Sequence, residues 1–174
     1  MWARGEPLDP LKKQIAMAKT SIHIVPIKPG SEAHNRREKQ LDYVRKEFSH
    51  LNESWEVDSI ENRLTDIRAR YTATTGQRMQ GKATPIREGV AVIGKDTTME
   101  QLRDFAKRIE ARFGIKTIQI HIHRDEGHAT GKDWKPNLHA HLVFDWTNDQ
   151  GKSIKLNRQD MAEVQTILAD CLGM

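Results

Sequence analysis

The sequence contains very little cysteine, because Cys171 is the one thiol in 174 residues. A disulfide framework is therefore excluded, and this composition fits a reducing cytoplasm. Long apolar runs are also lacking, since no stretch approaches the roughly 18 residues that a membrane span requires. Internal repeats and low-complexity segments are missing as well. These absences favour a cytoplasmic globular protein over a secreted scaffold, a membrane protein or a repeat array.

Charge and hydrophobicity leave several classes of protein open. Hydrophobic residues make up 37% of the chain and charged residues 30%, which is typical of a folded domain. The net charge is +4 and the pI is near 9.2. This balance favours an acidic partner such as nucleic acid, although many soluble proteins are equally basic.

The two ends of the chain differ from its middle. Residues 1–16 contain Gly5, Pro7 and Pro10 without a sustained period, and we interpret them as a non-native or upstream leader. Met17 is then the expected biological start. A final helix stops at Gly173 without a closing element, so residues 17–174 are expected to be the N-terminal part of a longer protein.

The spacing of apolar residues predicts the secondary structure. Strands are expected at 21–27, 88–94, 116–124, 137–146 and 152–156, and helices at 35–50, 59–74, 97–113 and from 157 onward. Asp58 or Ser59 can cap the second helix, and Thr97 with Glu100 has the spacing of a capping box. Pro26 restricts the first strand to a sheet edge or to its own end. This order predicts an α+β domain with a largely antiparallel sheet and helices packed over one face.

Histidine placement is the most informative local pattern. His121 and His123 lie two apart on one predicted strand, and His139 and His141 lie two apart on the next. Residues two apart on a strand point to the same face, so the four imidazoles cluster if the strands are neighbours. Neutral imidazole is a common ligand of divalent metals, and the pattern therefore predicts a metal site.

Residues that alternate with the histidines are apolar, and the opposite face of the sheet is expected to pack against helices. They are Ile120, Ile122, Leu138, Ala140, Leu142 and Phe144.

Acidic residues flank the histidines. Asp125 and Glu126 follow His123, and Asp145 follows His141 on the same predicted face. A carboxylate there can accept a hydrogen bond from a ligand imidazole, and Glu126 can also bind the metal itself.

Three segments carry a family resemblance. Residues 123–126 (His-Arg-Asp-Glu), followed after an insert by 136–141 (Pro-Asn-Leu-His-Ala-His), resemble the third motif of Mob/Pre-type (MobV-like) plasmid mobilisation relaxases. Residues 139–141 also match the His-hydrophobic-His signature of the HUH endonuclease superfamily. Residues 34–37 (His-Asn-Arg-Arg) resemble the first motif, and 50–52 (His-Leu-Asn) the second. The three occur in family order.

The chain departs from that pattern at two places. Asn52 is followed by Glu53 where the family has tyrosine, and the insert 127–135 is longer than the usual short link. His128 in this insert is expected to be exposed. Trp134 is expected to pack over the site or to stack on a base.

The resemblance implies an HUH relaxase fold with a ferredoxin-like palm and the His-x-His pair on a central strand. It also implies nicking of one DNA strand at a transfer origin by transesterification, a covalent link to the 5′ phosphate, and later resealing. The implied partners are single-stranded or supercoiled origin DNA and accessory mobilisation or coupling proteins. A divalent metal at His123, His139 and His141 is implied, with manganese first and magnesium, zinc or nickel as alternatives.

Further roles are implied by the same resemblance. His34 is the implied nucleophile, with Tyr43 as its competitor, whereas Tyr71 is expected in the core. Arg37 is expected to contact the phosphate or orient the nucleophile, and Glu126 to act in catalysis. The remaining residues expected at the DNA are Asn35, Arg36, Asn52 and Trp134.

Three other functions stay open at this point. A rolling-circle replication initiator or transposase would share the chemistry. A non-catalytic origin-binding protein would keep the histidines for structure alone, and a metallohydrolase would release both DNA ends free.

Overall fold

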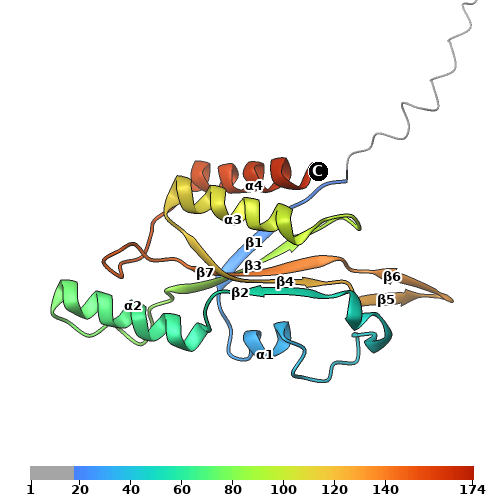
Figure 1. Cartoon of the computed structure of the whole chain (residues 1–174), viewed down its shortest axis with the longest axis horizontal. Helices are drawn as coiled ribbons and strands as arrows, with labels where there is room; N and C mark the ends of the chain where they lie inside the picture. Colours follow the sequence, from blue (N-terminus) through green and yellow to red (C-terminus); the bar gives the residue numbers. More distant parts are fainter. Residues whose placement is uncertain (1–17) are drawn as a thin grey trace, which may run out of the picture.

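Five antiparallel strands form the central sheet of the computed structural model, which describes residues 18–174 (Figure 1). Their order is β1-β3-β7-β4-β2. The bounds are β1 Ile22–Pro26, β2 Glu53–Glu56, β3 Ile86–Val92, β4 Lys116–His123 and β7 His139–Asp145. The predicted α+β class with an antiparallel sheet is confirmed, as is the edge position of the first strand. The proposed leader 1–16 and the start at Met17 lie outside the described residues.

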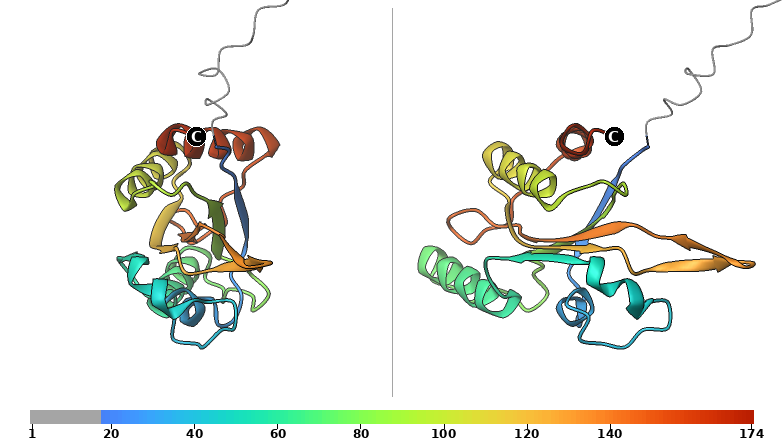
Figure 2. Two further views of the ribbon diagram at one scale, coloured as in Figure 1. Left: turned by 90° about the vertical axis from the view of Figure 1, so that its right-hand side faces the viewer. Right: turned by 45° about the vertical axis from the view of Figure 1, so that its right-hand side comes forward.

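Helices cover both faces of this sheet, so the expectation of a single covered face is wrong. The helices α3 (Met99–Phe113) and α4 (Arg158–Leu172) lie on one face, and α1 (Ser31–Asn35) and α2 (Ile60–Thr75) lie on the other (Figure 2). None of the helices within residues 18–174 is long and apolar enough to cross a membrane.

The face beneath α3 and α4 holds the main hydrophobic core. Ile120, Ile122, Ala140, Leu142 and Phe144 are buried there, as their alternation with the histidines predicts, and Leu138 packs against them partly buried. On the two central strands, the side chains of one face are therefore buried in the core, and those of the other face can be polar.

A smaller apolar cluster occupies part of the opposite face. Ile67 of α2 packs on Ile86, Ile118 and Val143. The pairing of β4 with β7 shifts between Thr117 and Gln119, and this irregularity turns Ile118 toward the cluster. Beyond it, the same face carries histidines instead of apolar residues.

Helix ends match the predicted chemistry with one shift. Ser59, one of the two expected cap residues, caps α2, and Asn157, where the last helix was predicted to begin, caps α4. The capping box of α3 is formed by Thr98 and Gln101 and not by Thr97 and Glu100, because the hydroxyl of Thr97 accepts from the backbone of Gly94.

Two other predicted segments are wrong, and the insert, for which no helix or strand was predicted, has a structure of its own. The expected helix at 35–50 is replaced by the short α1, an irregular stretch and a 3-10 helix, η2 (Lys46–Leu51), because the left-handed backbone of Arg37 (φ 58°) ends the first helix. Residues 152–156 form only an isolated bridge between Thr147 and Ser153. The insert forms a hairpin of β5 (Gly127–Thr130) and β6 (Asp133–Pro136).

Gly151 fixes the loop after β7 against α2 and supplies a test of this packing. Its φ is +73°, and a methyl group there would lie 2.7 Å from the backbone nitrogen of Tyr71. Gly76 has a similar φ of +69° with nothing within 4 Å, so it is a matched control. We expect Gly76→Ala to cost about 1 kcal/mol, and Gly151→Ala at least about 2 kcal/mol more. Urea denaturation measures both; equal losses would contradict the tight contact.

Candidate metal centre and active site

Pairing of the two central strands brings the histidines of both pairs together. His123 lies opposite His139, and His121 lies opposite His141. The ring centroids of His123 and His139 are 5.3 Å apart, and His141 lies 4.9 Å from His123 and 5.0 Å from His139. The predicted common face of the two His-x-His pairs is therefore confirmed.

His121 does not join this cluster. Its Nδ1 lies 2.8 Å from the Ser54 hydroxyl and its Nε2 lies 3.1 Å from the side-chain oxygen of Gln119. Burial lowers the pKa of His121 to about 4, so the ring is neutral. The expected grouping of all four strand histidines is wrong, because β2 supplies His121 with a separate polar environment.

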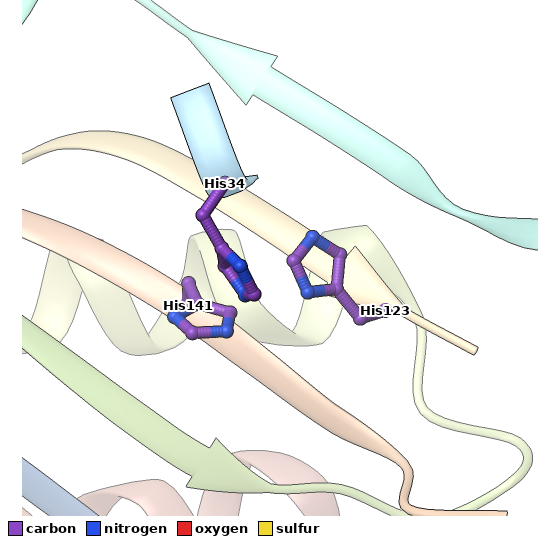
Figure 3. A group of neighbouring side chains, drawn as sticks. All are labelled: His34, His123 and His141. Atoms are coloured by element: carbon purple, nitrogen blue, oxygen red, sulfur yellow. The ribbon is translucent and has the colours of Figure 1, made fainter. Parts of the chain in front are cut away.

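His34 takes the fourth place from outside the sheet. α1 presents its imidazole toward the strands, and the ring lies 5.4 Å from that of His141 and 5.8 Å from that of His123 (Figure 3). The Nε2 atom of His34 is 3.6 Å from a carboxylate oxygen of Glu126. A segment far away in the sequence thus reaches the histidine face.

The outer nitrogens of two histidines are held by backbone carbonyls. Nε2 of His123 donates to the carbonyl of Asn35 at 3.0 Å, and Nδ1 of His139 donates to the carbonyl of Asn137 at 2.8 Å. A carbonyl only accepts, so the proton is fixed on these nitrogens. The lone pairs of His123 Nδ1 and His139 Nε2 are therefore directed into the cluster.

The inner nitrogens fit a metal ion. Within residues 18–174, Nδ1 of His123 and both ring nitrogens of His141 are buried without a hydrogen-bond partner. Two overlapping groups each place three donor atoms within 4.8 Å of one another, and they share His123: one adds His34 and His141, the other Glu126 and His139. Imidazoles joined by one carboxylate suit manganese, zinc or nickel.

Glu126 is held ionised beside these rings. Its carboxylate oxygens lie 3.6 Å from Nδ1 of His123 and 3.5 Å from Nε2 of His139. Burial alone would raise the pKa of Glu126, but the adjacent imidazoles of His123 and His139, together with the hydrogen bond and positive charge of Arg37, hold it at about 2. A charged carboxylate facing buried imidazoles is a ready metal ligand.

Arg37 connects this carboxylate to its neighbour Asp125. The guanidinium donates to both oxygens of Asp125, at 2.6 and 3.1 Å, and to Glu126 at 2.7 Å. Ser49 also donates to Asp125, at 2.7 Å. Burial opposes ionisation of Asp125, yet these donors bring its pKa down to about 2. Arg37 is thus a positioning residue for the two acids.

The two nucleophile candidates differ in their protonation chemistry. Burial, followed by the neighbouring His141, lowers the pKa of His34, so its ring is neutral at pH 7. Burial and Glu126 raise the pKa of Tyr43, so its phenol stays protonated. The Tyr43 ring lies 6.4 Å from that of His34. Tyr71, expected in the core, is half-buried on α2.

Several residues predicted to contact DNA instead make contacts within the protein. Asn35 is buried and donates to Glu88 at 2.7 Å, and Asn52 accepts from the backbone of Arg124. Arg36 pairs with Glu32 and Glu56. Trp134 is half-buried on the hairpin, and the expected exposure of His128 is confirmed.

Two acids have roles that differ from the sequence prediction. Asp145 is buried away from the cluster in ion pairs with Arg63 and Arg70. Glu88 was not predicted, although its carboxylate lies 3.6 Å from Nδ1 of His141. Glu88 is the one acid of β3, whose other residues apart from Arg87 are apolar, and this was the signal that could have identified it.

The five-stranded antiparallel sheet and its helices have the same fold as a relaxase domain of known structure. Crystal structures of the MobM relaxase domain (MOBV; Mob_Pre) bound to manganese and to plasmid pMV158 oriT DNA share this fold. One with a 22-nucleotide DNA has a TM-score of 0.63 and 18% identity over 90% of this chain and 86% of that one. Another, with 23 nucleotides, has a TM-score of 0.61 and 14% identity over 90% and 84%. No family model and no curated protein matches the sequence.

Removal of Arg37 tests its role in holding the acids. Arg37→Ala leaves the fully buried carboxylate of Asp125 without its cation, so we expect unfolding to become easier by about 3–5 kcal/mol. The adjacent Arg36 forms ion pairs whose members are about a third exposed, and Arg36→Ala should cost less than about 1 kcal/mol. Chemical denaturation of the two variants gives the comparison, and similar losses would contradict a special role for Arg37.

Proposed function

We propose that the chain is a metal-dependent relaxase that nicks one DNA strand at a transfer origin and stays joined to the 5′ phosphate. The observation that carries the proposal is the approach of His34, whose ring centroid lies 5.4 Å from that of His141 on β7. His34 belongs to one of the two donor groups, but the other group is complete without it, which leaves this neutral, partly accessible imidazole available to attack a phosphate. The likeness to a relaxase domain solved with oriT DNA and manganese supports the same conclusion.

His123, His139, His141 and Glu126 would hold the metal. Their side chains are 10% exposed or less, whereas that of His34 is 24% exposed, which suits a group that must reach DNA. Manganese is our first choice, with magnesium, zinc and nickel as alternatives. A bound divalent ion would polarise a non-bridging oxygen of the scissile phosphate and neutralise its developing charge.

His34 would act as the nucleophile. Its neutral ring attacks phosphorus through a nitrogen lone pair, forming a P–N bond while the bond to the 3′ oxygen breaks. The phosphorylated ring gives up the proton of its other nitrogen, the departing 3′ oxygen gains one, and the 5′ phosphate stays on the protein. The reverse attack by the 3′ hydroxyl reseals the strand without a nucleotide cofactor, because the phosphoryl link is preserved.

Arg37 would hold Glu126 and the nucleophile segment in place during this step. Arg37 fixes Asp125 and Glu126 and lies 3.4 Å from the carbonyl of His34, so it positions both the acid and the nucleophile segment. We therefore assign Arg37 the orienting role and not the phosphate contact. The cytoplasm is the expected compartment, and accessory mobilisation or coupling proteins are expected partners.

The metal site can be tested without activity. In a Mn²⁺ titration followed by calorimetry and thermal shift, wild type should bind and gain stability, because the ion binds the folded state. His139→Ala should weaken binding at least about a hundredfold. His121→Gln is the matched control on the neighbouring strand, since His121 lies outside the cluster, and it should still bind. Loss of binding in both variants, or in neither, would place the metal elsewhere.

The nucleophile is tested on supercoiled plasmid that carries the DNA upstream of the gene, incubated with Mn²⁺ and denatured with detergent. Wild type should yield open circles with protein on the 5′ end. His34→Ala should reduce the adduct by at least about a thousandfold, since a nucleophile has been removed. His139→Ala should lose it through the metal, and Tyr43→Phe should still form it.

Each other outcome points to a different function. Loss of the adduct in Tyr43→Phe alone would make tyrosine the nucleophile. Nicking with free ends would indicate a hydrolase. Absence of nicking on both supercoiled and single-stranded origin DNA would leave origin binding as the function.

A further inference from the structure

A hairpin stands directly beside the candidate metal centre. β5 and β6 occupy the chain between Glu126 and the histidine pair of β7, and they project past the end of the sheet (Figures 1 and 2). The register pairs His128 with Lys135 and Ala129 with Trp134. Alternation therefore puts His128 and Lys135 on one face of the hairpin and Trp134 on the other.

The base of the hairpin is fixed to the site. The guanidinium of Arg45 lies 4.3 Å from the centre of the Trp134 ring, and the backbone of Arg45 donates to Asp125 at 2.8 Å. A β-bridge joins Val44 to Glu126. Gly127 allows Trp134 to fold close, since a methyl group there would lie 2.6 Å from its ring. Trp134 thus packs under Arg45 and holds the base of the hairpin in place, and its ring is not an open stacking surface.

A cleft of about 510 Å³ opens between this hairpin and the segment after α1. Tyr43 forms one wall, His128 and Lys135 form the other, and Glu126 lies at the inner end. Glu126 also faces the metal-site histidines, so the cleft and the metal centre adjoin through one carboxylate. Tyr43 is 47% exposed, which leaves its ring available to a ligand.

These groups match the parts of a nucleotide. An exposed aromatic ring provides a stacking surface for a DNA base, and such stacking does not depend on which base is present. The ammonium of Lys135 can pair with a backbone phosphate, and its position across the cleft from Tyr43 fits the opposite sides of one nucleotide. The carboxylate at the inner end disfavours a second anion there unless a cation is bound beside it.

We propose that this cleft binds the nucleotide that flanks the scissile phosphate, with its base against Tyr43 and its phosphate beside Lys135. The inference rests on the proposed function, because it takes single-stranded DNA as the substrate. It makes Tyr43 a DNA-binding residue in place of a nucleophile. The hairpin then sets the path by which the strand enters the metal centre.

Equilibrium binding of a fluorescein-labelled dT 20-mer, measured by anisotropy with Mn²⁺ present, tests this cleft. Tyr43→Ala should weaken binding about five- to a hundredfold through lost stacking, and Tyr43→Phe should retain most of it. Lys135→Glu should weaken binding and reduce its salt dependence by about one phosphate contact. Lys132→Glu makes the same charge change at the hairpin turn, outside the cleft, and should have a clearly smaller effect.

Photo-crosslinking locates the base directly. An oligonucleotide that carries 5-iododeoxyuridine should attach to the peptide containing Tyr43, as identified by mass spectrometry. Adducts confined to other segments would overturn the proposal, as would equal effects of Lys135→Glu and Lys132→Glu or a wild type that fails to bind the dT 20-mer. Neither experiment requires nicking, so a protein that binds in this way but forms no covalent adduct would refute the proposed reaction and leave the cleft in place.

Discussion

The ion pair between Arg37 and Asp125 is the contact on which the arrangement of this site depends. α1 has five residues, and a helix of that length is unstable by itself in water. Its position is therefore set by the residues directly after it, and the guanidinium of Arg37 joins that segment to the end of β4 by three hydrogen bonds. The left-handed backbone of Arg37, which costs about 1 kcal/mol, persists because the surrounding contacts over-determine it. Together with the hydrogen bonds of Asn35 to His123 and Glu88, this link fixes His34 relative to the histidines of the sheet.

The sheet itself serves the core and the site with the same two strands. In β4 and β7, every second residue packs under α3 and α4, and the residues between them are the histidines. A slip of one residue in this pairing would move the apolar side chains to the polar face and the histidines to the core face. Burial of Ile122 and Leu142 therefore also fixes the face on which His123 and His141 lie. The pairing irregularity near Ile118 ends the polar stretch and lets α2 close the rest of that face. Stability of the core and geometry of the site are thus determined by one register.

Patterns within single strands and helices were sufficient to predict most of the fold. The alternation around His121 to His123 and His139 to His141 identified the central strands and their packed face, and cap residues located α2 and α4. The same reasoning failed between α1 and η2, where helical spacing of Leu41, Val44 and Phe48 is overridden by contacts to Asp125. The clustering of His123, His139 and His141 was predicted, because it depends only on the pairing of neighbouring strands. Contacts between distant segments could not be predicted from the spacing of residues along one strand or helix. They keep His121 out of the cluster, bury Asn35 and place Glu88 beside His141.

The backbone carbonyl of Asn35 links the histidine cluster of the sheet to the segment that carries His34. It accepts the outer proton of His123 and belongs to the residue directly after His34. Occupation of the inner nitrogen of His123 by an ion would fix the ring, and with it the carbonyl and the segment that carries His34, the proposed nucleophile. Linkage of this kind is reciprocal, so ordering of that segment by DNA would in turn tighten the hold on the ion. One hydrogen bond between a ring and a main-chain oxygen therefore connects a proposed metal ligand, His123, directly to the backbone of the segment that carries His34.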